Sequence, residues 1–239
     1  MNIDATNLHF KDLNDKVRQS QEDICIDNCI GQCFIASGSS NKTITVNGTP
    51  GNALGAYLDG SIVYVNGNAQ DAVGDTMNEG KIIINGSAGD ALGYAMRGGE
   101  IYVKGNAGYR TGIHMKQYKD KKPIIVVGGE AGSFLGEYQA GGLLIVLGIG
   151  AEGKIPVGNF TGTGMHGGYI FIRCDEMPKD LPVQVSASVA TKEDLKQIEH
   201  YINEFAEHFG VDTKSILNSK FHVLIPNASN PYKQMYTTN

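Results

Sequence analysis

The sequence predicts an all-β protein: a right-handed, single-stranded parallel β-helix of about 19 residues per coil with short N- and C-terminal helical caps. Glycine supplies 32 of the 239 residues, and the glycines recur at a fixed spacing. Aliphatic residues recur at the same spacing. Each glycine costs a helix about 1 kcal/mol relative to alanine, so the repeat unit must be extended.

The glycine repeat divides each unit into three short sides. Two columns of glycines follow the 19-residue spacing: Gly48, Gly67, Gly86 and Gly105, and then Gly55, Gly74, Gly93 and Gly112. The pattern resumes after an insertion at residues 117–122. Glycine tolerates the bends at the corners, and three extended sides that close on themselves form one coil. We expect roughly six or seven coils about 4.8 Å apart, wound right-handed by the crossover preference of parallel strands.

Two aliphatic columns, two residues apart, define the interior. They read Ile44, Val63, Ile82, Ile101, Ile125, Leu144, and Val46, Val65, Ile84, Val103, Val127, Val146. Strand alternation places both on one face, which must be the core. A methionine column, Met77, Met96, Met115 and Met165, is interpreted as core filling. Asn47, Asn66 and Asn85 predict a side-chain amide ladder, and Asp71 and Asp90 predict carboxylates bonded to turn backbone.

The column between the two interior ones points outward but is mostly apolar. It reads Thr45, Tyr64, Ile83, Tyr102, Val126, Ile145. Such a face must be covered, either by a terminal helix of the same chain or by another subunit. Arg97, Lys116 and His166 each follow a methionine of the ladder, and we expect them to form an outward polar column. The candidate interface therefore comprises Tyr64, Ile83, Tyr102, Val126, Ile145, Arg97, Lys116 and His166.

The chain divides into three segments by this pattern. Residues 1–42 predict an N-terminal helix, around Phe10, Leu13 and Val17, and an irregular first coil; residues 43–173 are the repeats; residues 174–239 form a C-terminal helical extension. In the extension, Thr191 is a candidate N-cap and Gly210 a candidate end of a helix, with a shorter helix near residues 212–218. The apolar stripe of the longer helix reads Leu195, Ile198, Ile202, Phe205, Phe209. Both ends would cap open strand edges.

Composition argues against several classes of protein. The formal charge is −5 and no basic block is present, which excludes nucleic acid and anionic membrane as main partners. The N-terminus shows no secretory signal, and the apolar run at residues 143–147 is too short to span a bilayer, so a cytoplasmic protein is expected. Four cysteines do not make a disulfide framework.

The search for catalytic chemistry gives no catalytic, cofactor-binding or metal residues. The run GTGMHG at residues 162–167 matches G-x-G-x-x-G but precedes a strand, so a dinucleotide site is not supported. Cys25, Cys29 and Cys33 fit neither ferredoxin nor C-x2-C zinc spacing, and we interpret them as buried thiols. Among six histidines, only His114 and His166 lie in glycine-bounded segments.

The repeats resemble a known family. The run VNGNAQDAVGDTMNEG, INGSAGDALGYAMRGG, VKGNAGYRTGIHMK and the ending GTGMHGGYIFIR are similar to the GXGXG domain, the C-terminal right-handed β-helix of the glutamate synthase large chain. The resemblance covers about residues 43–173. The flanks, including LIPNASNPYKQMY, resemble stand-alone versions in which each glutamate synthase domain is a separate chain.

This resemblance implies a non-catalytic scaffold subunit of a glutamate synthase-like oxidoreductase complex in glutamate biosynthesis and ammonia assimilation. The expected partners are an amidotransferase chain and a chain that carries FMN and an iron–sulfur cluster, with no cofactor in this chain; a homo-oligomer is a further expectation. A related β-helix in formylmethanofuran dehydrogenase-like or N-methylglutamate synthase-like complexes remains an alternative. A β-helical acyltransferase using His114 or His166 is disfavoured, because such coils repeat every 18 residues.

Overall fold

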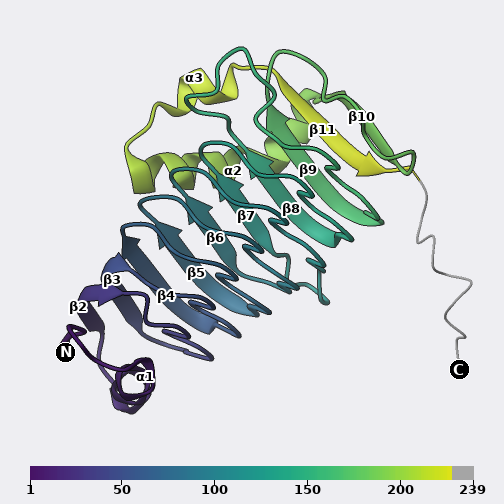
Figure 1. Cartoon of the computed structure of the whole chain (residues 1–239). Coiled ribbons are helices and arrows are strands. Elements are labelled where there is room, and N and C mark those ends of the chain that lie inside the picture. Colours follow the sequence, from purple (N-terminus) through teal and green to yellow (C-terminus); the bar gives the residue numbers. More distant parts are fainter. Residues whose placement is uncertain (228–239) are drawn as a thin grey trace, which may run out of the picture.

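A computed structural model, which describes residues 1–227, shows strands stacked into one 11-stranded sheet that runs along the whole molecule (Figure 1). The strands up to β9 pair in parallel and in chain order, which confirms the predicted parallel β-helix. They are β1 (Asn2–Asp4), β2 (Ile24–Ile30), β3 (Thr43–Thr49), β4 (Asp59–Asn66), β5 (Glu79–Ile84), β6 (Glu100–Val103), β7 (Ile124–Val127), β8 (Ala140–Val146) and β9 (Gly167–Arg173).

The register between strands reproduces the spacing of the repeat. Ile44 lies opposite Val63, and Ile82 opposite Ile101. The offset widens between β6 and β7, where Ile101 lies opposite Ile125 and the predicted insertion loops out. A second side of each coil is a short bridge formed by a column of alanines and one valine: Ala69, Ala88, Ala107, Ala131, Val157. The two predicted interior columns and the methionines are buried in one continuous core.

The third side of each coil is an arc in which alternate residues have left-handed backbone. After β5, Ala91, Gly93 and Ala95 have φ of 55°, 67° and 51°. The Ala91 N–H donates forward to Tyr109 O at 2.8 Å, whereas the Gly93 N–H donates backward to Val73 O at 2.8 Å. The arc is therefore bonded to the coils on both sides, and its backbone groups are satisfied without a regular strand.

Polar side chains form ladders along the turns of the stack. Asn66 Nδ2 donates to Asn47 Oδ1 at 2.7 Å, which confirms that part of the amide ladder; no bond joins Asn66 to Asn85 in the described residues. The predicted turn carboxylates are confirmed, since Asp71 Oδ1 accepts from the Asp90 N–H at 2.9 Å and Asp90 Oδ1 accepts from the Tyr109 N–H at 2.8 Å. Each carboxylate thus joins one coil to the next.

The ends of the chain form the predicted helices and two strands that the repeat pattern did not predict. The helices are α1 (Phe10–Gln19), α2 (Lys192–Phe209) and α3 (Thr213–Leu217). The structure confirms Thr191 as the N-cap of α2, in a capping box with Asp194, and Gly210 as its left-handed C-cap. The additional strands, β10 (Val185–Val189) and β11 (Phe221–Pro226), pair antiparallel, and β11 also pairs antiparallel with β9.

One of the three segments contains more than the sequence pattern indicated. β2 lies within residues 1–42 and pairs in parallel with β3, and so belongs to the irregular first coil expected there. The C-terminal extension is strand as well as helix, because β11 covers the edge of the last coil. Part of that extension, with the whole SNPYKQMY run, lies outside the described residues. No helix within residues 1–227 is long and apolar enough to cross a membrane.

We predict that Gly93→Ala destabilises the protein by about 2–4 kcal/mol. A Cβ at Gly93 would lie 2.3 Å from Cδ1 of Ile125, and the backbone there has φ +67°. The cost is therefore overpacking of the core, about 1–3 kcal/mol, added to left-handed strain of about 1 kcal/mol. Chemical denaturation followed by circular dichroism measures the change.

The matched control is Gly150→Ala. Gly150 has φ +86°, but a Cβ there meets no atom within 4 Å. This variant should lose only the backbone contribution, about 1 kcal/mol. Equal losses in the two variants would show that the approach of Ile125 to the arc does not limit the packing of the coils.

Candidate interaction site

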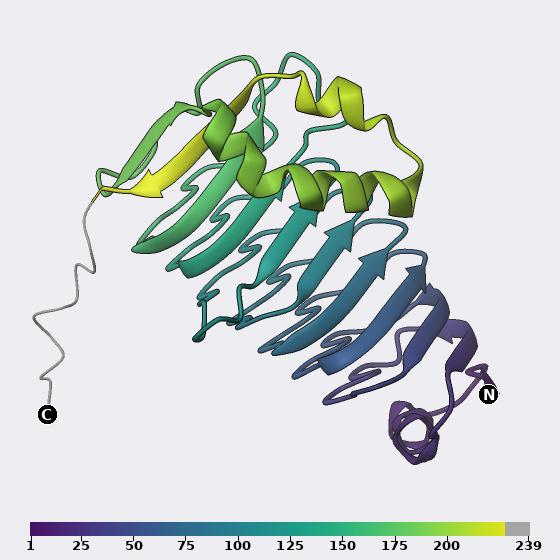
Figure 2. The same ribbon diagram turned by 180° about the vertical axis from the view of Figure 1, so that it is seen from behind.

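Helix α2 covers the outward apolar column of the sheet (Figure 2). Ile83, Tyr102, Val126 and Ile145 are buried in a second core together with Ile198, Ile202 and Phe205 of α2, and Tyr64 packs against its edge. The sequence left open whether a terminal helix of the same chain or another subunit covers this column. The structure shows that it is the terminal helix. Ile83, Tyr102, Val126 and Ile145 are therefore removed from solvent by their own chain and cannot meet a partner while α2 is in place, whereas Tyr64 stays half-buried at the margin.

A polar cluster fixes α2 at the margin of this second core. The Tyr102 hydroxyl donates to Glu204 Oε2 at 2.9 Å and lies 2.8 Å from Glu100 Oε2. Lys81 pairs with Glu204 and, at 3.1 Å, with Glu100. Tyr102 is fully buried, so its hydroxyl needs these partners. The cluster joins β5 and β6 to one turn of α2 and sets where the helix lies.

Within this cluster, ion pairs and hydrogen bonds between the side chains offset the effect of burial on their pKa values. Burial alone raises the pKa of Glu204, but the bonds from Lys81 and Tyr102 outweigh it and hold that pKa below its ordinary 4.5. For Lys81 the burial lowers the pKa, and bonds to Glu204 and Glu100 reverse this and raise it. Burial and the neighbouring carboxylates raise the pKa of Tyr102 far above 10. Glu204, Lys81 and Tyr102 therefore keep their ordinary ionisation at pH 7.

The predicted polar column after the methionines is only partly exposed. Arg97 and Lys116 are exposed. Their backbone N–H groups donate to Met77 O and Met96 O, respectively, each at 2.9 Å. His166 is half-buried, with Nδ1 3.1 Å from Gly164 O. Arg97 and Lys116 thus lie at the surface, as predicted. Their role in an interface stays a prediction.

A surface that was not predicted from the sequence lies on the arcs of the later coils. Here aromatic rings and one arginine stack from coil to coil. Phe134 and Phe160 have ring centroids 5.0 Å apart, and Arg110 Cζ lies 4.9 Å from the Phe134 centroid. His114 stacks on Tyr138 at 5.1 Å and meets Tyr94 edge-on at 5.9 Å. We name this surface the aromatic arc: Tyr94, Arg110, His114, Phe134, Tyr138, Phe160.

The aromatic arc places large side chains at strained positions. Arg110, Phe134 and Phe160 have φ of 59°, 64° and 61°, in a column where the coils just before them carry alanine, at positions such as Ala72 and Ala91, and the first coil carries Phe34. Phe160 is 56% exposed, so burial does not compensate for the strain. Bulky residues with positive φ are outliers that persist where function or packing requires them. The replacement of alanine by Arg and Phe in one column was the sequence signal for this surface.

A glycine of the closing repeat makes room for the aromatic arc. A Cβ at Gly164 would lie 2.4 Å from Cδ1 of Tyr138, and Gly164 has φ +69°. The GTGMHG run at residues 162–167, considered above as a nucleotide motif, therefore serves packing beside Tyr138. His114, a catalytic candidate in the acyltransferase alternative, is one of the stacked rings, and His166 lies on the adjacent turn.

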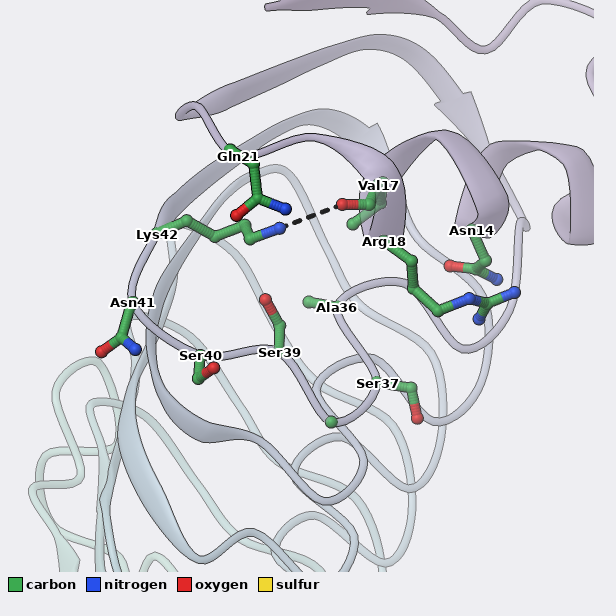
Figure 3. A pocket seen from close by; sticks show the side chains of 11 residues that line it. Asn14, Val17, Arg18, Gln21, Ala36, Ser37, Ser39, Ser40, Asn41 and Lys42 are labelled. Carbon is green, nitrogen blue, oxygen red and sulfur yellow. Dashed lines mark hydrogen bonds between the residues drawn. The ribbon is translucent and has the colours of Figure 1, made fainter.

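A polar pocket of about 320 Å³ lies between α1 and residues 36–42 (Figure 3). Lys42 Nζ donates to the carbonyls of Val17 at 3.1 Å and Ser20 at 2.6 Å, at the end of α1. Arg18 pairs with Asp15. Lys42 and Arg18 therefore already have partners within the chain. We interpret the pocket as the space left where α1 packs on the first coil.

Of the three cysteines interpreted as buried thiols, Cys29 is buried, whereas Cys25 and Cys33 are only half-buried. All four cysteines are free, and burial raises the pKa of Cys29 to about 11. The fold also brings Cys174 Sγ within 3.4 Å of His222 Nδ1, a contact no spacing predicted. Burial raises the pKa of Cys174 to about 11 and lowers that of His222, so both groups are neutral at pH 7. Within residues 1–227, no group of three or more His, Cys, Asp or Glu side chains is placed to hold a metal ion.

Comparison with known proteins gives one family and two informative relatives. The model of the GXGXG motif family matches residues 14–228. The chain is 45% identical to the uncharacterized protein MJ1350 of Methanocaldococcus jannaschii, over 98% of this chain and 95% of the relative. Among solved structures, it resembles a chain of the formyltransferase/hydrolase complex of Methylorubrum extorquens with methylofuran, at TM-score 0.65 and 19% identity, over 92% of this chain and 89% of that one. The last likeness shows a shared fold.

We predict that Glu204→Gln lowers the free energy of unfolding by about 2 kcal/mol at pH 7, because charged hydrogen bonds of roughly that strength are lost. The pKa of Glu204 is depressed in the folded protein, so its contribution is present above its unfolded pKa and is lost as pH falls through the folded one. The stability gap between wild type and variant should therefore begin to narrow near pH 4.5 and close as the pH falls through the lower pKa of the folded protein. Denaturant titrations between pH 3 and 8 measure it.

Glu199→Gln is the control, since Glu199 is an exposed carboxylate on the same helix. It should change stability by less than about 0.5 kcal/mol at any pH. A gap for Glu204→Gln that stays constant down to pH 3 would contradict an ionised role for this carboxylate.

Proposed function

From the fact that this chain belongs to the GXGXG motif family, we propose that it is a non-catalytic β-helix subunit that holds other chains of an enzyme complex in place. Such a subunit needs a rigid body and a surface for partners. The continuous core and the coil-to-coil ladders supply the rigidity. The aromatic arc is our candidate for the surface that meets a partner.

One observation carries this proposal: in the aromatic arc, large side chains on left-handed backbone stack from coil to coil, and Phe160 among them is 56% exposed. Aromatic residues and arginine dominate the binding energy of protein interfaces. Arg110 also pairs with Glu137 at 3.1 Å, which holds its guanidinium beside the Phe134 ring. A surface fixed in this way loses little side-chain entropy on binding.

The first candidate complex is of the glutamate synthase type. The matched family includes the β-helix of the glutamate synthase large chain, whose motifs this chain resembles. In this proposal the partners are an amidotransferase chain and a chain with FMN and an iron–sulfur cluster. Those chains carry the reaction, and this chain braces them.

The second candidate is a one-carbon complex. The solved neighbour is a chain of a formyltransferase/hydrolase complex, and it shares the fold along nearly the whole chain. In that case the same scaffold would join formyl-transferring and hydrolysing subunits. The N-methylglutamate synthase-like alternative has no comparable observation in its favour.

Co-expression tests these candidates. A tagged copy of the chain is expressed with the amidotransferase-type and flavin-type chains of its own genome, and in parallel with the formyltransferase-type chains. The first candidate predicts a stoichiometric complex with flavin absorbance near 450 nm, whereas the second predicts retention of the formyltransferase set. A chain that stays alone with both sets would overturn the proposed function.

We predict that Phe160→Ala and Phe134→Ala each weaken partner binding by about 2 kcal/mol, roughly 30-fold in Kd. Phe160 is 56% exposed, so the melting temperature of Phe160→Ala should change little, whereas Phe134 is half-buried and its variant should lose somewhat more stability. Titration calorimetry with the purified partner measures binding. Tyr57→Ala is the control, because Tyr57 is 56% exposed on an early coil outside the aromatic arc. Equal losses for Tyr57→Ala would show that this surface is not the binding site.

A further inference from the structure

The sheet ends in an open edge at β10 (Figure 1). Among residues 1–227, β10 pairs with β11 alone. The Asn227 N–H donates to Gln184 O and the Ala190 N–H to Phe221 O, both at 2.9 Å. Antiparallel ladders alternate, so the even-numbered residues of β10 bond to β11 and the odd-numbered ones direct their backbone groups away from the sheet.

The outward backbone groups of β10 can be assigned one by one. The N–H and C=O of Ala187 and of Val189 face outward by this alternation. The Val185 N–H donates to Pro182 O at 2.9 Å, so only the carbonyl of Val185 is available to another strand. These groups form a row of donors and acceptors along one side of the strand, which is a template for another strand.

β10 lacks the features that normally protect an edge strand. It reads VSASV, with no charge and no proline, and its register with β11 is continuous without a bulge. The opposite edge is different, because β1 has three residues and ends in Asp4. Proteins usually blunt exposed edges with charge, proline, bulges or shortness. The contrast indicates that the β10 edge is made to be paired.

We propose that β10 pairs antiparallel with β10 of a second copy of this chain, about a two-fold axis at Ala187. The sequence VSASV is a palindrome about Ala187, so Val185 would face Val189, Ser186 would face Ser188, and Ala187 would face itself. The outward groups match this register. Each Ala187 donates to the other Ala187 carbonyl, and each Val189 N–H donates to the other Val185 carbonyl.

Apolar side chains are exposed around β10, and their burial would favour pairing of this edge with a second copy of the chain. Val189 is 51% exposed and would meet the partner copy's Val185 across the new ladder. Val183 is 94% exposed just before the strand, and Ile225, opposite Ser186, is 39% exposed. A contact of this length buries less than the standard interface, so we expect a dissociation constant in the micromolar range. The sheets of two copies would then be continuous, with the free ends of the β-helices pointing apart.

Sedimentation velocity of the full chain over a range of concentrations tests the proposal. The wild type should show a reversible monomer–dimer equilibrium. Ala187→Pro removes the central outward N–H, and proline is tolerated at such edge positions, so the monomer should keep its melting temperature. Its dimer Kd should rise by about 30-fold or more, because two hydrogen bonds are lost per dimer. Ala187→Ser keeps the N–H and should dimerise like the wild type.

Two further measurements keep the proposal falsifiable. If Ala187→Pro does not fold, Val189→Lys replaces it as the test. This variant places a charge on the edge and should also abolish the dimer. Hydrogen exchange of the Ala187 and Val189 amides should slow as protein concentration rises. A wild type that is monomeric at all concentrations, or amides protected independently of concentration because the chain covers its own edge, would overturn the proposal. So would a dimer that survives both substitutions.

Discussion

The bonding of each coil to the next is the constraint on which the rest of this structure depends. Every side of a coil must place its N–H and C=O groups against the neighbouring coil, so equivalent positions keep their register along the stack and additional residues must loop out, as they do between β6 and β7. On the strand side this is ordinary parallel pairing. On the arc it requires left-handed residues at alternate positions, with N–H groups directed forward and backward in turn. Glycine enters where the interior side chains approach most closely.

This constraint also explains why the side chains fall into ladders. Once the backbone repeats, equivalent residues lie directly above one another, and their interactions add along the axis. Inside, the ladders are aliphatic and methionine columns. At the turns they are amides and carboxylates that accept from the next coil. On the later arcs they are aromatic rings and Arg110. A binding surface on such a body is set by which columns become large and exposed.

The ends of the stack determine how the molecule meets others. Helix α2 folds back over the sheet and is fixed there by Glu204, Tyr102 and Lys81, so the outward apolar column becomes a second core. The arc side and the edge at β10 remain among the surfaces open to partners. The aromatic arc is the basis of the scaffold role proposed here, and the β10 edge is the basis of the proposed self-association. The two surfaces belong to different sides of the coil and are open to independent tests.

The sequence by itself determined the repeat, the interior columns, the turn carboxylates and the terminal helices, because each depends on local spacing that a coil copies into space. It also carried the family motifs, which the comparison confirmed over nearly the whole chain. It could not decide whether α2 or a partner covers Tyr102, because that depends on the path of a chain that turns back after about a hundred residues to reach Glu204. Nor could it predict β10 and β11, since their pairing follows from the unpaired edge of β9 and not from any periodicity of their own. The aromatic arc was readable as a change from alanine to Arg and Phe, but only the stacked coils bring those residues into contact.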